Sequence, residues 1–106
     1  MAASLILSAC GQSSFELPQD DAERGVFCVV AIARLAPSVE NPELSSRLND
    51  AARNAEREAR AAYPGSAASQ TTGSYEEYLI SMIARTTFED QDEMRAILSS
   101  CIDEYA

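Results

Sequence analysis

The uncharged segment Val26–Ala33 constrains the fold more than any other part of this chain of 106 residues. Its β-branched residues suit a buried strand as well as a helix, so its own pattern does not decide between the two. Because no other segment has strand character, a strand here would have no partner. We therefore expect a helix over residues 19–36, with Pro18 in its first turn and Pro37 after its end. Because a helix that is apolar on most of its surface is usually buried, we expect the other helices to surround this one.

A second helix is expected over residues 42–63, because Asn41 is a suitable N-cap, Pro42 fits the first helical position and Pro64 stops the helix. Its apolar residues recur every three or four positions and are mostly alanines. A seam of such small side chains lets another helix approach closely. Packing within one chain is favoured over a coiled-coil dimer, because the repeat covers only about three turns, and we expect a monomer. The seam residues are Leu44, Leu48, Ala51, Ala55, Ala59 and Ala62.

Residues 64–73 are small and polar, which predicts one long flexible loop. Ser74 and Glu77 have the spacing of a capping box, in which each side chain binds a backbone N–H of the helix start. This signal predicts a third helix over residues 75–86.

Thr87 and Asp90 repeat the capping-box spacing thirteen residues after Ser74. We therefore expect a break near residues 85–87 and a fourth helix over residues 88–105. The apolar stripe of this helix is continuous and places Cys101 on the buried face. Together these segments predict an all-α fold, a small bundle of about four helices around the apolar first helix, in one domain over residues 19–106.

The charge of the chain narrows the classes of partner. The chain has seventeen Asp and Glu residues, eight arginines and no lysine or histidine, which gives a net charge of -9. Nucleic acids and anionic lipid surfaces are bound by clustered positive charge, so neither is an expected partner. Residues 74–106 hold eight acidic residues and two arginines, which leaves -6 on this part. This acidic lobe serves solubility or forms a docking face for a basic protein.

If the acidic lobe binds a protein, its anchors are expected among four consecutive residues near the start of the third helix. Tyrosine is enriched at protein interfaces, and carboxylates beside it suit a basic partner. The predicted face consists of Tyr75, Glu76, Glu77 and Tyr78.

Catalysis is not expected. Without histidine the commonest general base is missing, and without lysine so is the commonest Schiff-base residue. The carboxylate pairs fall at helix starts or on solvent faces, where they serve the helix dipole and solubility. The acidic residues 89–93 lack the alternating ligands and turn glycine of a calcium loop. We therefore expect no cofactor and no metal.

One short motif bears on location. Leu7-Ser8-Ala9-Cys10 resembles the lipobox of bacterial lipoproteins, in which an aliphatic residue and two small residues precede a cysteine. The resemblance implies that the Cys10 thiol carries a diacylglyceryl group and that the chain is cut just before it. In this family Gly11, rather than aspartate, after the cysteine implies sorting to the outer membrane.

The resemblance also implies a division of the first eighteen residues. Residues 1–9 would be the remnant of a signal peptide, and residues 10–18 a lipid-anchored tether. Ala2–Leu7 is shorter than the apolar core of a secretory signal and no basic residue precedes it, so we expect an in-frame extension upstream. On this view the domain faces the periplasm of a bacterial cell envelope and contacts the membrane through its lipid anchor only.

If the chain is exported, its three cysteines divide into a lipid site and a pair. Cys28 and Cys101 then form a disulfide that ties the first and last helices together. In a reducing cytoplasm both would instead be buried thiols. The sequence thus supports two functions: a non-catalytic binding or assembly component of the envelope, or a soluble cytoplasmic adaptor or inhibitor with free thiols.

Overall fold

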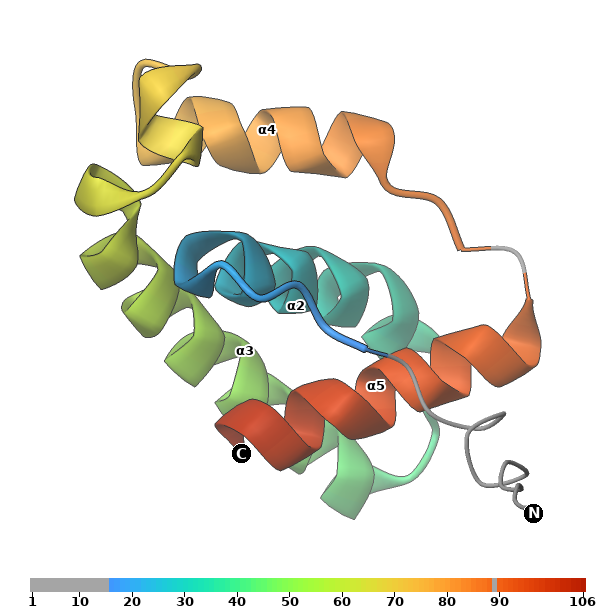
Figure 1. Ribbon diagram of the computed structural model, residues 1–106. Coiled ribbons are helices and arrows are strands. Elements are labelled where there is room, and N and C mark those ends of the chain that lie inside the picture. The colour runs from blue at the N-terminus through green and yellow to red at the C-terminus, as the bar shows by residue number, and fades with distance from the viewer. Residues whose placement is uncertain (1–15, 89) are drawn as a thin grey trace, which may run out of the picture.

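The structure, a computed structural model, describes residues 16–88 and 90–106 (Figure 1). This part of the chain forms four α-helices and three short 3-10 helices, which confirms the predicted all-α bundle. The α-helices are α2 (Asp21–Leu35), α3 (Pro42–Ala62), α4 (Tyr75–Arg85) and α5 (Gln91–Tyr105).

The first described helix, α2, begins two residues later than expected. Asp20 is its N-cap, and the Asp20 carboxylate accepts a hydrogen bond from the backbone N–H of Glu23 at 2.9 Å. Pro18 therefore precedes the helix, and the prediction that it lies in the first turn is wrong. The first N–H groups of a helix need an acceptor, which an aspartate carboxylate provides and a proline side chain does not.

The helix α2 lies between the other three helices, as Figure 1 shows. Different sides of α2 are buried by α3, α4 and α5, so the expectation of a central apolar helix is confirmed. Its buried residues are Ala22, Gly25, Val26, Cys28, Val30, Ala31 and Ile32.

The alanine seam of α3 packs against α2. Leu48, Ala51, Ala55 and Ala59 are fully buried. A Cβ atom added to Gly25 of α2 would lie 2.7 Å from the Ala55 carbonyl oxygen and 2.7 Å from the Ala59 Cβ. The two helices thus meet almost backbone to backbone, which confirms the close approach predicted from the seam.

The connection between α3 and α4 differs from the predicted flexible loop. It contains the 3-10 helices η2 (Tyr63–Gly65) and η3 (Ala68–Gln70). The Tyr63 hydroxyl donates a hydrogen bond to the Thr72 carbonyl oxygen at 2.9 Å and also pairs with the Thr72 hydroxyl at 2.7 Å. The small polar side chains of this segment are therefore used in local hydrogen bonds that fold it onto the end of α3.

The predicted break between the third and fourth helices is confirmed, but the predicted cap is wrong. The N-cap of α5 is Asp90, whose carboxylate accepts a hydrogen bond from the Asp92 N–H at 3.0 Å. Thr87 lies outside the helix. Residues 86–88 are not helical, and the Phe88 ring lies against Phe27 of α2, with ring centroids 6.2 Å apart.

Candidate functional site

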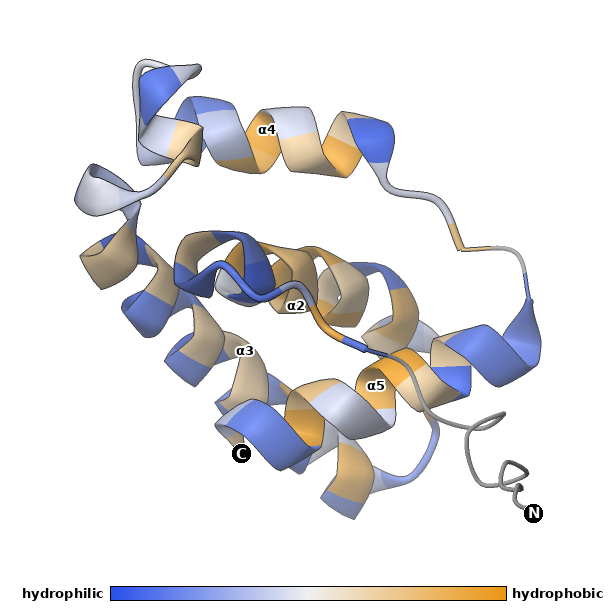
Figure 2. Cartoon of the chain, viewed as in Figure 1, coloured by the Kyte–Doolittle hydropathy of each residue, from blue (hydrophilic) through white to orange (hydrophobic). Residues whose placement is uncertain are grey.

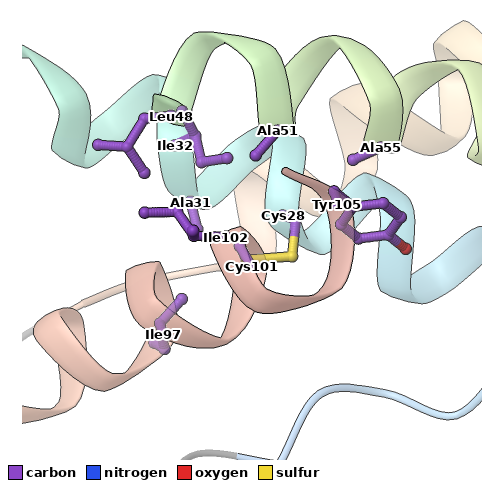
Figure 3. Close-up of a cluster of buried hydrophobic side chains, with 10 residues drawn as sticks. All are labelled: Cys28, Ala31, Ile32, Leu48, Ala51, Ala55, Ile97, Cys101, Ile102 and Tyr105. Carbon is purple, nitrogen blue, oxygen red and sulfur yellow. A yellow bond between two sulfur atoms is a disulfide. The ribbon is translucent and has the colours of Figure 1, made fainter. Parts of the chain in front are cut away.

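The disulfide is the centre of the larger of two apolar clusters. Cys28 of α2 and Cys101 of α5 are bonded, with their Cα atoms 5.7 Å apart, and both are fully buried. Figure 3 shows the bridge among side chains from α2, α3 and α5. The predicted pairing is confirmed. Because no solvent reaches either sulfur, the bridge acts as a structural cross-link and not as a redox site.

The predicted lipidation site, Cys10, lies outside the described residues, as do residues 1–9 and most of the predicted tether. The last part of that tether is described. Leu17 packs against the apolar cluster around the disulfide.

The predicted tyrosine anchors do not face outward. Tyr75 and Tyr78 are each only 6% exposed and pack with Tyr63, at centroid distances of 6.2 and 6.1 Å. Burial raises the pKa of the Tyr75 hydroxyl, and it raises the pKa of Tyr78 to about 12. The anchor role predicted for these two residues is therefore wrong, because a second apolar cluster of the bundle needs their rings.

The two glutamates of the predicted face are exposed, and both are used within the chain. A Glu76 carboxylate oxygen lies 3.0 Å from Nη1 of Arg60, and this hydrogen bond lowers the pKa of Glu76. Glu77 accepts a hydrogen bond from the Gly73 N–H at 2.7 Å. The Arg60 guanidinium also lies 4.3 Å from the centroid of the Tyr75 ring, a cation–π contact. The contacts of Arg60 with Glu76 and Tyr75 join α3 to α4.

A different concave surface is formed where the start of α3 meets the first half of α5. We call it the α3–α5 groove. It has a volume of about 470 Å³, within the range of small-molecule and peptide side-chain sites. Its lining residues are Leu35, Ser38, Val39, Glu40, Asn41, Leu44, Gln91, Met94, Arg95 and Leu98.

This groove is not predicted by any pattern in the sequence. Met94 and Leu98 belong to the apolar stripe of the fourth helix, and Leu44 belongs to the seam of the second, so the sequence pattern predicts all three in the core. In the structure these three side chains are only partly buried. The sequence signal nearest to the groove is Val39, an apolar residue in the short connection between two predicted helices.

A second hollow lies between α2 and α4. It has a volume of about 320 Å³ and is lined by Val29, Val30, Ala33, Arg34, Leu79 and Ile83. Ile80, which is 65% exposed, and Ile83, which is 41% exposed, are the large apolar side chains most exposed in the described residues. This hollow, which we call the α2–α4 hollow, is a second candidate surface.

Within residues 16–88 and 90–106, acidic and cysteine side chains do not gather in groups of three or more that could hold a metal ion. Among the same residues, no helix combines the length and the apolar character needed to cross a bilayer. Comparison with protein-family models, curated proteins and solved structures found no match to this chain.

Proposed function

We propose that this chain is a non-catalytic binding or assembly domain of a bacterial lipoprotein, anchored through Cys10. One observation carries the proposal: the bond between Cys28 and Cys101 uses two of the three cysteines. The remaining cysteine is the one in the lipobox-like motif. A bonded pair of cysteines and one remaining cysteine in the motif are what we expect of an exported and lipid-modified chain.

The disulfide also supports the cell envelope as the location. Such bonds persist in oxidising compartments and are rare in a cytoplasm that keeps thiols reduced. We place the domain on the periplasmic side of the envelope, and the residue after the cysteine, Gly11, favours the outer membrane.

Acyl chains are the form of membrane attachment that suits this surface. A net charge of -9 opposes binding to anionic lipid headgroups. One acyl chain alone anchors only marginally, whereas the several chains carried by bacterial lipoproteins meet the requirement for stable attachment. The partner of the anchored domain is proposed to be a basic protein, because electrostatic attraction steers opposite charges together.

The intact mass of the protein purified from its native cell tests this proposal. We expect a species that begins at Cys10 and carries several acyl chains, and a Cys10→Ala variant that lacks them and is released from the membrane. An unmodified chain that begins at Met1 or Ala2 would contradict the proposal. A thiol count without reductant gives a second test: one free thiol or fewer is expected, whereas three would identify a cytoplasmic protein.

A further inference from the structure

We infer that Arg24 holds the segment before α2 on the bundle, so that the tether between the lipid anchor and the bundle ends at Glu16. The inference rests on the proposed function for its setting, an anchor at Cys10. Its own support comes from the contacts and the burial of Arg24 and Leu17.

Arg24 lies near the start of α2 and bonds back to the chain that precedes this helix. Its Nη1 donates hydrogen bonds to the carbonyl oxygens of Gln19, at 3.1 Å, and of Pro18, at 3.3 Å. One guanidinium nitrogen thus holds two successive carbonyl groups that lie outside the helix. Because a guanidinium carries five N–H donors in a fixed fork, the other nitrogens can bind further partners at the same time.

The other nitrogens of Arg24 contact carboxylates of α2 and α5. Nη2 donates a hydrogen bond to the Asp21 carboxylate, and Nε lies 3.8 Å from a carboxylate oxygen of Glu104, in the last turn of α5. That end of α5 is itself held in place, because Asn54 of α3 donates a hydrogen bond to the Tyr105 carbonyl oxygen at 2.7 Å. Arg24 therefore connects residues 18 and 19 to the two helices that the disulfide joins.

The low exposure of Arg24 distinguishes its contacts from ordinary surface ion pairs. Its side chain is 20% exposed, whereas the other arginines that form ion pairs in the described residues are between 48% and 75% exposed. Exposed ion pairs contribute little to stability because water competes for both charges. A largely buried guanidinium instead destabilises the fold unless its donors are used. The burial of Arg24 thus requires acceptors, and the carbonyl groups of Pro18 and Gln19 supply two of them.

Leu17 extends the attached segment by one residue, because it packs against the apolar cluster around the disulfide. Figure 2 shows this single apolar position in the otherwise hydrophilic segment that leads into α2. Leu17 is partly buried and Glu16 is exposed, so the tether comprises residues 10–16 instead of residues 10–18. Seven residues span at most roughly 25 Å when fully extended. The bundle, and the partner that it binds, are then confined to the layer next to the bilayer.

Nuclear magnetic relaxation of the full-length Cys10→Ser chain, with the disulfide intact, tests the attachment without any lipid. We expect the backbone amides of Leu17 and Gln19 to be as ordered as those of α2. Arg24→Met keeps the apolar stem of the side chain and removes its N–H donors, so in this variant the two amides are expected to become mobile on the nanosecond timescale while α2 stays ordered. Arg53→Met is the control, because Arg53 is exposed and its ion pair lies within α3.

A glutamate-specific protease measures the same attachment on a membrane. Cys10 is coupled to a maleimide lipid in neutral phosphatidylcholine vesicles, and the two bonded, buried cysteines do not react. Cleavage after Glu16 requires local opening of the chain and releases the bundle, whose new start at Leu17 is identified by mass spectrometry. Release is expected to be about tenfold faster in Arg24→Met, because hydrogen bonds of a charged group are lost. Arg53→Met is expected to leave the rate unchanged.

Three results would overturn the inference. The first is nanosecond mobility of Leu17 and Gln19 in the chain with Arg24 intact, which needs no variant and would extend the tether to the N-cap of α2. The second is unchanged order and release in Arg24→Met, with mobility produced by Leu17→Ala instead, which would assign the attachment to the apolar contact. The third is a loss of order throughout the bundle in Arg24→Met, or equal acceleration of release by Arg53→Met, which would show a general effect on stability.

Both experiments are independent of lipidation in the cell, because one uses no lipid and the other attaches it chemically. The proposed function and this inference therefore fail separately.

Discussion

At the scale of single residues, the contact between α2 and α3 depends on the absence of one methyl group. Gly25 lies inside α2, where alanine is preferred by about 1 kcal/mol in helix propensity. The glycine is explained by its surroundings, because the Ala55 carbonyl oxygen belongs to the backbone of α3 and cannot move aside alone. The packing requirement outweighs the helix propensity.

Gly25→Ala is therefore expected to destabilise the protein by about 1 to 3 kcal/mol, the usual cost of forcing a methyl group into a packed core. Urea unfolding followed by circular dichroism measures the change in the free energy of unfolding. Gly65→Ala is the control, because a Cβ there meets nothing within 4 Å, and it should change stability by less than about 1 kcal/mol. A Gly25→Ala protein as stable as the parent would show that α2 and α3 lie farther apart than described.

Tyr78 predicts how stability depends on alkaline pH. Burial, and then Glu23 and Asp20, raise its pKa from 10.0 to about 12 in the folded state. Between these values the unfolded chain loses the proton and the folded chain keeps it, so the free energy of unfolding falls as pH rises. One proton corresponds to a slope of about 1.4 kcal/mol per pH unit.

Urea unfolding between pH 9 and about 12 tests this linkage, in a Cys10→Ser background that prevents thiol exchange. In Tyr78→Phe the slope is expected to be shallower by about one proton, while Tyr75 and Tyr105, whose pKa values burial also raises, keep its sign the same. An identical slope in both proteins would show that Tyr78 titrates normally in the folded state.

At the scale of helices, the end of α4 and the start of α5 are held by different means. Arg34 of α2 donates to the carbonyl oxygens of Ile83, at 2.8 Å, and Thr86, at 3.0 Å, so a side chain from another helix satisfies acceptors at the end of α4. The start of α5 is instead capped locally, by Asp90.

The position of the α5 cap can be tested by two alanine substitutions. Asp90→Ala is expected to cost about 1 kcal/mol, because it leaves the Asp92 N–H without its acceptor. Thr87→Ala, at the position where the sequence pattern predicted the cap, is expected to change stability by less than about 0.5 kcal/mol. Chemical denaturation measures both, and the reverse order of the two effects would contradict the described start of α5.

At the scale of the whole molecule, the disulfide joins the central helix to the last helix across a separation of 73 residues. It closes nearly the whole described chain into one loop. The free energy of unfolding of a domain is commonly about 5 to 15 kcal/mol, so such a cross-link supplies a large share of the stability of a bundle of this size.

Reduction of this bond, or the pair Cys28→Ala and Cys101→Ala, is expected to lower the free energy of unfolding by about 4 kcal/mol. Urea unfolding of the oxidised and reduced forms measures the loss. Because both sulfurs are fully buried, reduction of the folded protein should proceed only as fast as the bundle opens. Rapid reduction under native conditions, with no change in the unfolding midpoint, would contradict the structural role.

The sequence alone determined those features that depend on neighbouring residues. Capping residues and prolines predicted four helices to within a few residues, because these signals act within one turn of the chain. The alanine seam predicted a close helix contact, since helical periodicity places its members on one side. The pairing of Cys28 with Cys101 followed from counting cysteines once Cys10 was set aside, although it depended on export.

Tertiary structure alone decided which side of each helix is covered and where it is left open. Tyr75 and Tyr78 have rings that suit an interface or a core equally well, and packing with Tyr63 buried them. Thr87 carried a capping signal, but the helix is capped by Asp90, and the neighbouring Phe88 packs on Phe27 of α2. The α3–α5 groove is formed by segments that lie far apart in the sequence, residues 35–44 and 91–98. No local pattern contains such a surface, because it exists only after the helices have packed.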